Sequence, residues 1–179
     1  MSKNIVYFDL ETQRSAQEVG GWGHINKMGM SIGVTYSTER ESYQIYTEDQ
    51  VDALVSELHR ADLVVGYNII RFDFAVLEPY AFFDFSQVPA LDMLVSLEKT
   101  IGHRLSLDAV AEASLGIGKT AVGTDALKWW KEGKIREIAE YCCYDVKATK
   151  LVHEYGVQYG KVLYVSSKTR LKEEIPVSW

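Results

Sequence analysis

The 179-residue sequence is poor in cysteine, and this shortage already excludes several classes of protein. Its only two cysteines, Cys142 and Cys143, are adjacent. Adjacent cysteines rarely form a disulfide, and this pair lacks the two-residue gap of a zinc or redox motif. We therefore predict that both are buried helix residues in a reducing compartment.

Linkers, repeats and long apolar runs are missing as well. No Pro/Ser-rich or low-complexity tract interrupts the chain, and its longest apolar runs are far too short to span a membrane. Residues 1–4 lead directly into a strand-like segment, without the features of a signal peptide. We expect one domain over residues 1–179 in a soluble cytoplasmic protein, assumed monomeric, with a tail of uncertain role at residues 161–179.

An excess of positive charge is also absent. The formal net charge of −6 argues against a basic protein that binds nucleic acid without specificity. The charge does not exclude an enzyme that attracts phosphate through bound metal ions, because such ions would supply the local positive field themselves.

The order of the hydrophobic patterns predicts an α/β fold. Early strands followed by alternating strands and helices indicate a mixed sheet covered by helices. Ser106 and Gly116 have the residue types expected at the start and end of one of these helices. We predict strands over 5–10, 30–37, 42–47, 63–67 and 90–97, helices over 48–60, 71–78, 105–115, 125–131 and 134–159, and an irregular or strand-like tail.

Two carboxylates lie at the end of the first predicted strand. Asp9 and Glu11 are two residues apart, so their side chains point to the same face of the strand. Such a pair is unfavourable beside apolar residues unless donors or a cation satisfy it, and Mg²⁺ prefers oxygen ligands of this kind. The alternative is a solvated loop at the end of the strand, and the pair alone does not decide between these interpretations.

Further candidates follow later strands and helices. Asp73 comes after the predicted strand 63–67 and begins a helix, where the helix dipole alone would favour a carboxylate. Tyr141 and Asp145 are four residues apart on one face of the last helix, which is also a common arrangement on helix surfaces. Taken singly, each of these residues has a structural explanation.

The combination is more specific than its parts. The three motifs are Phe8-Asp9-x-Glu11-Thr12, Asn68-x-x-x-Phe72-Asp73 and Tyr141-x-x-x-Asp145. In this order and placement they resemble the DEDD exonucleases of the DnaQ-like, RNase H-like superfamily, over residues 5–159. The tyrosine resembles the DEDDy branch, since Glu140 occupies the position of the histidine in the other branch. The chain also looks like stand-alone exonucleases related to polymerase proofreading domains, whose helix between the second and third motifs resembles residues 103–115.

The resemblance implies a function and a role for each residue. Asp9, Glu11, Asp73 and Asp145 would hold two divalent cations, Mg²⁺ or Mn²⁺, which clamp the attacking and leaving oxygens. Tyr141 would orient the attacking water, because a phenol with a pKa of about 10 is a poor base at neutral pH. The expected reaction is 3′–5′ exonucleolytic hydrolysis of single-stranded nucleic acid, with DNA slightly favoured over RNA. We expect release of 5′-nucleotides and distributive trimming.

Contacts to the substrate are predicted in and beside these motifs. Aromatic side chains can stack on any base, although an aromatic residue in a glycine-rich loop is as often a packing anchor. The candidates are Thr12, Trp22, Asn68, Phe72 and His103, with Tyr67 as a further stacking residue and Arg104 as a further phosphate contact. The alternative for Asn68 is a turn residue, and the favoured alternative for His103 and Arg104 is a solvated loop. Asp92 and Asp108 match no catalytic position, and we interpret them as helix caps or surface charges. The P-loop-like segment 113–120 follows a helix rather than a strand, so we do not expect it to bind ATP.

Two other functions remain open at this stage. The segment Asp9-Leu10-Glu11-Thr12 loosely resembles the Asp-x-Asp-x-Thr motif of haloacid dehalogenase phosphatases, with Asp9 as the nucleophile. Glu11 is one methylene too long for that motif, and the two later motifs would have no role. The third possibility is an RNase H-like interaction module without catalytic activity.

Overall fold

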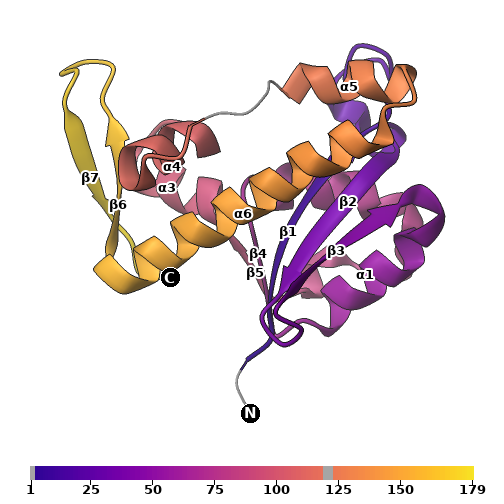
Figure 1. Cartoon of the computed structure of the whole chain (residues 1–179), viewed down its shortest axis with the longest axis horizontal. Coiled ribbons are helices and arrows are strands. Elements are labelled where there is room, and N and C mark those ends of the chain that lie inside the picture. Colours follow the sequence, from indigo (N-terminus) through magenta and orange to yellow (C-terminus); the bar gives the residue numbers. More distant parts are fainter. Residues whose placement is uncertain (1–2, 119–122) are drawn as a thin grey trace.

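The computed structural model describes residues 3–118 and 123–179. Five strands form a mixed sheet in the order β3-β2-β1-β4-β5 (Figure 1). The strands β1, β2 and β3 pair antiparallel, whereas β4 is parallel to both β1 and β5. Their bounds are Ile5–Thr12 for β1, Met30–Ser37 for β2, Ser42–Thr47 for β3, Leu63–Gly66 for β4 and Ala90–Asp92 for β5. The predicted α/β mixed sheet flanked by helices is confirmed.

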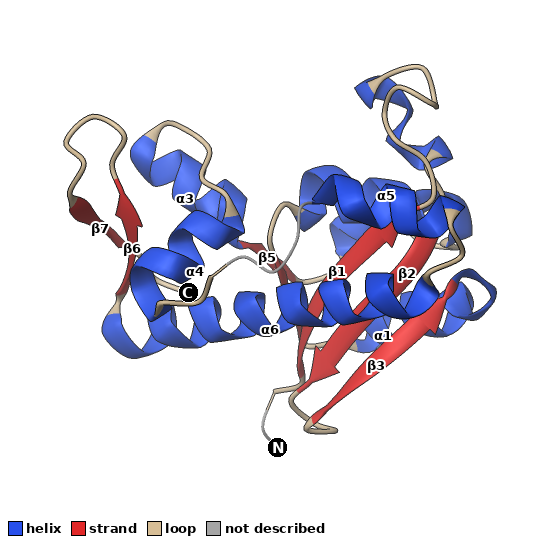
Figure 2. Cartoon of the chain, turned by 45° about the horizontal axis from the view of Figure 1, so that its top comes forward, coloured by secondary structure: helices blue, strands red, loops and turns tan. Residues whose placement is uncertain are grey.

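Helices cover both faces of this sheet (Figures 1 and 2). One face packs against α1 and α2, and the other against α3, α4, α5 and α6. Their bounds are Val51–Arg60 for α1, Phe74–Leu77 for α2, Met93–Ile101 for α3, Leu107–Leu115 for α4, Gly123–Lys131 for α5 and Ile135–Tyr159 for α6. The chain ends in a hairpin of β6 (Lys161–Val165) and β7 (Lys172–Pro176), so strands occupy part of the predicted irregular or strand-like tail.

The central strand β1 alternates between the two cores. Phe8 packs with the apolar residues of α1 and α2, and Tyr7 packs with those of α6. This alternation follows from the two-residue period of a strand. Asp9 and Glu11 therefore lie on the same face as Tyr7, the face that α6 covers.

Several predicted boundaries are confirmed and others are wrong. Ser106 caps α4 by accepting a hydrogen bond from the Ala109 amide, and Gly116 ends it with φ 70°. The predicted strand 90–97 is wrong beyond Asp92, because the Asp92 carboxylate accepts a hydrogen bond from the Val95 amide and begins α3. Residues 113–118 of the P-loop-like segment lie at the end of α4 and in the loop that follows it, and residues 119–120 lie outside the described residues.

The predicted helices 48–60 and 71–78 are composite. A single 3₁₀ turn, Glu48–Gln50, precedes α1. A π-helical turn, Ile69–Asp73, precedes α2. Within the described parts of the chain, no helix is both long enough and apolar enough to cross a bilayer.

Candidate functional site

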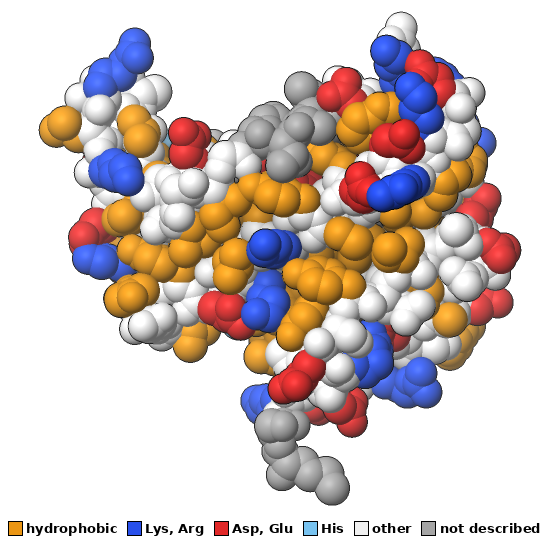
Figure 3. All heavy atoms as spheres, in the orientation of Figure 1, with side chains coloured by type: hydrophobic (Ala, Val, Ile, Leu, Met, Phe, Trp, Pro, Cys, Tyr) orange, Lys and Arg blue, Asp and Glu red, His pale blue; other side chains and the backbone are white. Residues whose placement is uncertain are grey.

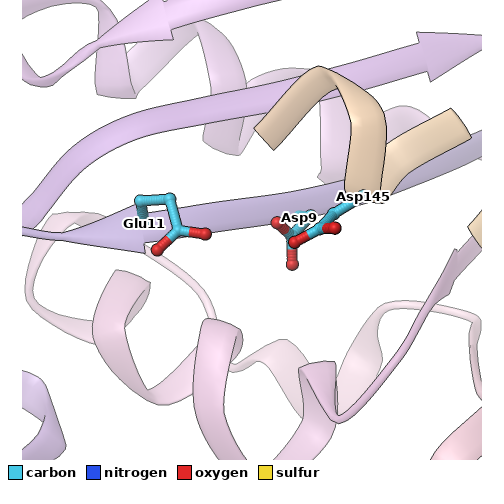
Figure 4. Close-up of side chains that lie close together, drawn as sticks. All are labelled: Asp9, Glu11 and Asp145. Atoms are coloured by element: carbon cyan, nitrogen blue, oxygen red, sulfur yellow. The ribbon is translucent and has the colours of Figure 1, made fainter. Parts of the chain in front are cut away.

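Three carboxylates meet between the sheet and the last helix (Figure 4). Asp9 and Glu11 extend from the end of β1, and Asp145 extends from the middle of α6. One carboxylate oxygen from each residue lies within 4.8 Å of the other two. A hard cation binds its oxygen ligands at about 2.0–2.6 Å, so opposite ligands are separated by at most about 5 Å. These three side chains can therefore share one ion.

Asp73 lies beside this group and not within it. Its side chain is buried, and its Oδ1 accepts a hydrogen bond from the Leu10 amide at 3.1 Å. The π-helical turn after β4 places it next to β1. Its charge is close enough to raise the pKa of Asp9 more than any other neighbouring charge does. All four predicted carboxylates are thus brought together, with three in direct proximity and the fourth anchored to the backbone of β1.

Burial and mutual repulsion raise the pKa values of these acids. Burial is the largest cause for both Asp9 and Glu11, whose pKa values lie well above the usual range, and the neighbouring carboxylates add to it. The pKa of Asp73 rises to about 7, mainly because of burial. Carboxylates in such surroundings are unfavourable when charged and unpaired. A bound divalent cation would remove this penalty, so the donor set fits a metal centre.

Tyr141 lies one helical turn before Asp145 on α6. Its ring contacts the Trp129 ring edge-to-face, at a centroid distance of 6.1 Å. Burial raises the pKa of its hydroxyl well above the usual value of 10, and the charges of Asp145 and Glu11 raise it further. The hydroxyl therefore stays protonated at neutral pH, so it can donate a hydrogen bond but is a poor general base.

A groove of about 570 Å³ begins at Glu11 and leads away from the carboxylates. Three of the predicted substrate residues, Thr12, Trp22 and Phe72, line it. The Trp22 side chain is 71% exposed, and its ring meets the Phe72 ring edge-to-face at 6.4 Å. Phe72 is half-buried, and the exposed Trp22 ring beside the carboxylates is suited to hold a base next to a metal centre.

The other predicted contacts lie elsewhere. Asn68 follows β4 with a left-handed backbone, φ 70°, and lines a neighbouring groove. His103 is exposed and packs near Tyr164 of β6, so its contact with substrate stays a prediction. The Tyr67 hydroxyl donates a hydrogen bond to the Leu105 carbonyl, which makes it a packing anchor.

Two residues have contacts that the sequence did not reveal. The Cys142 thiol donates to the Asp9 Oδ2 at 3.4 Å, and this hydrogen bond favours the charged carboxylate. Cys142 is buried as predicted, but Cys143 is only half-buried, because the next position points away from the core by a quarter-turn. Asp92 caps α3, which confirms one of its two predicted roles. Its side chain is buried, which excludes the other role, a surface charge.

Asp92 also supports the second motif. Its two carboxylate oxygens accept hydrogen bonds from the Asn68 amide at 2.8 Å and the Ile70 amide at 3.0 Å. These bonds hold the turn that carries Asp73. Asp108 lies half-buried in the first turn of α4, and Ser106 caps that helix, so the interpretation of Asp108 as a helix cap is wrong.

Comparisons with known proteins agree with this architecture. Residues 6–157 match the RNase_H superfamily. No curated protein sequence matches the chain. The family B DNA polymerase from the hyperthermophilic archaeon Pyrobaculum calidifontis has a similar fold, with a TM-score of 0.63 and 14% sequence identity. That likeness covers 88% of this chain and 25% of the polymerase chain, so the protein spans about a quarter of the polymerase's length.

Proposed function

The chain belongs to the RNase_H superfamily, and from this premise we propose that it is a metal-dependent nuclease. We further propose that it acts as a DEDDy-type 3′–5′ exonuclease on single-stranded nucleic acid. The observation that carries the proposal is the convergence of Asp9, Glu11 and Asp145, whose oxygens lie within 4.8 Å of one another. Family membership removes the support for a haloacid dehalogenase phosphatase.

Each residue of the site has a defined task in this reaction. Asp9, Glu11 and Asp145 would hold a divalent cation, and Asp73 would contribute to a second one. Bound cations would supply positive charge that acidifies water and offsets the charge of the leaving oxygen. Tyr141 would donate a hydrogen bond that orients the attacking water, since its hydroxyl stays protonated.

The groove at Glu11 suits the binding of a nucleotide strand. A base on the 5′ side of the scissile bond would pack against the Trp22–Phe72 pair while the scissile phosphodiester reaches the carboxylates. Stacking on aromatic side chains accepts any base, which suits an enzyme that removes successive nucleotides. We propose DNA as the preferred substrate and Mg²⁺ or Mn²⁺ as the cations.

The test uses single-stranded DNA and RNA oligonucleotides labelled at the 5′ end, with Mg²⁺, Mn²⁺ or EDTA. We expect a ladder of 3′-shortened products and free 5′-nucleotides, abolished by EDTA and by Asp9→Asn. The matched control is Asp52→Asn, an exposed acid on α1 at the opposite face of the sheet, which should keep full activity. Immediate release of the label as a mononucleotide would contradict the direction. Intact substrates in every condition would instead support an interaction module.

A further inference from the structure

A second groove adjoins the first and contains two arginines. It has a volume of about 310 Å³. Trp22 and Phe72 line both grooves, so the two grooves adjoin at this aromatic pair. The second groove is lined by Trp22, Ile25, Asn68, Arg71, Phe72 and Arg104. The aromatic pair thus lies between the first groove, which Glu11 and Arg14 both line, and a second groove whose only charged lining residues are Arg71 and Arg104.

The charge of Arg104 is available to a ligand. Its side chain is exposed, and its Nη2 donates a hydrogen bond to the neutral Asn68 Oδ1 at 3.3 Å. Among the described residues, no carboxylate lies within ion-pair distance of it. Arg71, in contrast, pairs with Glu98 of α3. Any anion that binds Arg71 would therefore have to compete with Glu98.

We propose that this second groove binds an internal phosphodiester of the substrate strand, on the 5′ side of the scissile bond. This inference rests on the proposed nuclease function. A strand whose 3′ end reaches the carboxylates passes the Trp22–Phe72 pair and continues into the second groove. Aromatic faces interleaved with arginines are the usual means of tracking a single strand, and guanidinium groups suit phosphate oxygens.

The chain's overall charge makes this subsite important. The formal net charge is −6, and the first groove begins at a carboxylate cluster, so a polyanionic strand is repelled there before cations bind. Arg71 and Arg104 supply a local attraction a short distance away. A dinucleotide has one phosphodiester, the scissile one, and therefore no internal phosphodiester for the second groove, whereas a ten-nucleotide strand has several. Dependence on substrate length is therefore the distinctive property of the subsite.

The experiment compares variants on a dinucleotide and on a ten-nucleotide DNA strand. Arg104→Gln should raise KM for the longer strand about tenfold, as expected for loss of one charge-assisted hydrogen bond. Its kcat and its activity on the dinucleotide should stay unchanged. The slope of log affinity against log salt should fall by about 0.7, because one phosphate contact is lost. Glu98→Gln should have the opposite effect and lower KM for the longer strand, because it frees Arg71.

Two control variants remove the same charge elsewhere. Arg60 ends α1 and precedes β4, whereas Asn68 and Arg71 follow β4 at its other end, so Arg60→Gln should leave KM unchanged. Arg170 is exposed at the tip of the β6–β7 hairpin, where Figure 3 shows a second group of basic side chains. A rise in KM for Arg170→Gln together with none for Arg104→Gln would place the phosphate contact on the hairpin and overturn the inference.

Failure of this inference can be distinguished from failure of the nuclease function. Binding of a fluorescent ten-nucleotide strand, measured by anisotropy in EDTA, does not require catalysis. Weaker binding by Arg104→Gln than by Arg60→Gln supports the subsite even if no substrate is cleaved. Equal binding by these two variants overturns the subsite, and an equal loss of activity on the dinucleotide does so as well.

Discussion

Replacing Glu11 with Gln tests whether the carboxylate cluster is held together against its own repulsion. Gln has nearly the same volume, and within the described residues the Glu11 carboxylate accepts no hydrogen bond that an amide would lose. The substitution therefore removes a charge and little else. We expect the metal-free variant to be more stable than the wild type, although nuclease activity should fall by several powers of ten.

The magnitude follows from the spacing of the acids. Two unit charges 4.8 Å apart repel each other by about 3 kcal/mol at an effective dielectric constant of about 20. The acids are half-buried, so solvent screens part of this repulsion and the observable gain is smaller. We expect roughly 1–2 kcal/mol at pH 8, which corresponds to a rise in Tm of roughly 3–6 °C for a chain of this size.

Bound metal should reverse this order of stability and make the wild type more stable than Glu11→Gln. A cation at 100 times its Kd stabilises the protein that binds it by about 2.7 kcal/mol. The wild type should gain this stabilisation in Mn²⁺, and Glu11→Gln should gain much less. The assay is thermal unfolding at pH 8 in EDTA and in Mn²⁺, with Glu39→Gln as an exposed control. The reasoning is refuted if Glu11→Gln is the less stable protein in EDTA, or if Mn²⁺ raises the Tm of both proteins equally.

Three further predictions concern α6. Tyr141→Phe should lower kcat about 100-fold by removing the donor to the attacking water, while Mn²⁺ still raises its Tm, and a kcat like that of the wild type would exclude this role. The Nδ1 of His153 lies 2.9 Å from the Tyr7 hydroxyl, and burial lowers the pKa of this imidazole. As the pH falls, His153 therefore takes up a proton in the unfolded chain before it does so in the folded protein. The free energy of unfolding should consequently fall as the pH drops below about 6.5. Denaturant unfolding between pH 7.5 and 5 checks this, since His153→Gln should lose less stability over that range. A Cβ at Gly156 would lie 2.2 Å from the Trp179 Nε1, so Gly156→Ala should displace the indole. We expect the free energy of unfolding to fall by about 1–3 kcal/mol and the tryptophan emission to shift to the red. An unchanged emission spectrum would contradict that packing.

Local patterns in the sequence were sufficient to predict which residues of β1 and of α6 point to the same side of their element. Asp9 and Glu11 share a face because a strand has a period of two, and Tyr141 and Asp145 share a face because a helix turns once in 3.6 residues. These rules place side chains relative to their own element. They therefore predicted which of these side chains share a face, but not the order of the strands in the sheet.

Such rules do not predict contacts between segments that are distant in the sequence. Asp92 is 24 residues from Asn68, and no spacing in the sequence indicates that its carboxylate accepts the amide hydrogens of that turn. The bond from the Leu10 amide to Asp73 spans 63 residues, and the bond from Cys142 to Asp9 spans 133. Each depends on how strands and helices pack, so each became visible only in three dimensions.

The position of β3 at the edge of the sheet has a consequence for solubility. Its outer side has no strand neighbour among the described residues, and Tyr43 and Ile45 are 40% and 43% exposed. The strand contains neither lysine nor proline, the residues that commonly prevent edge-to-edge pairing. Ser42–Thr47 is therefore an edge at which two copies of the protein can pair at high concentration, and Ile45→Lys should reduce that aggregation.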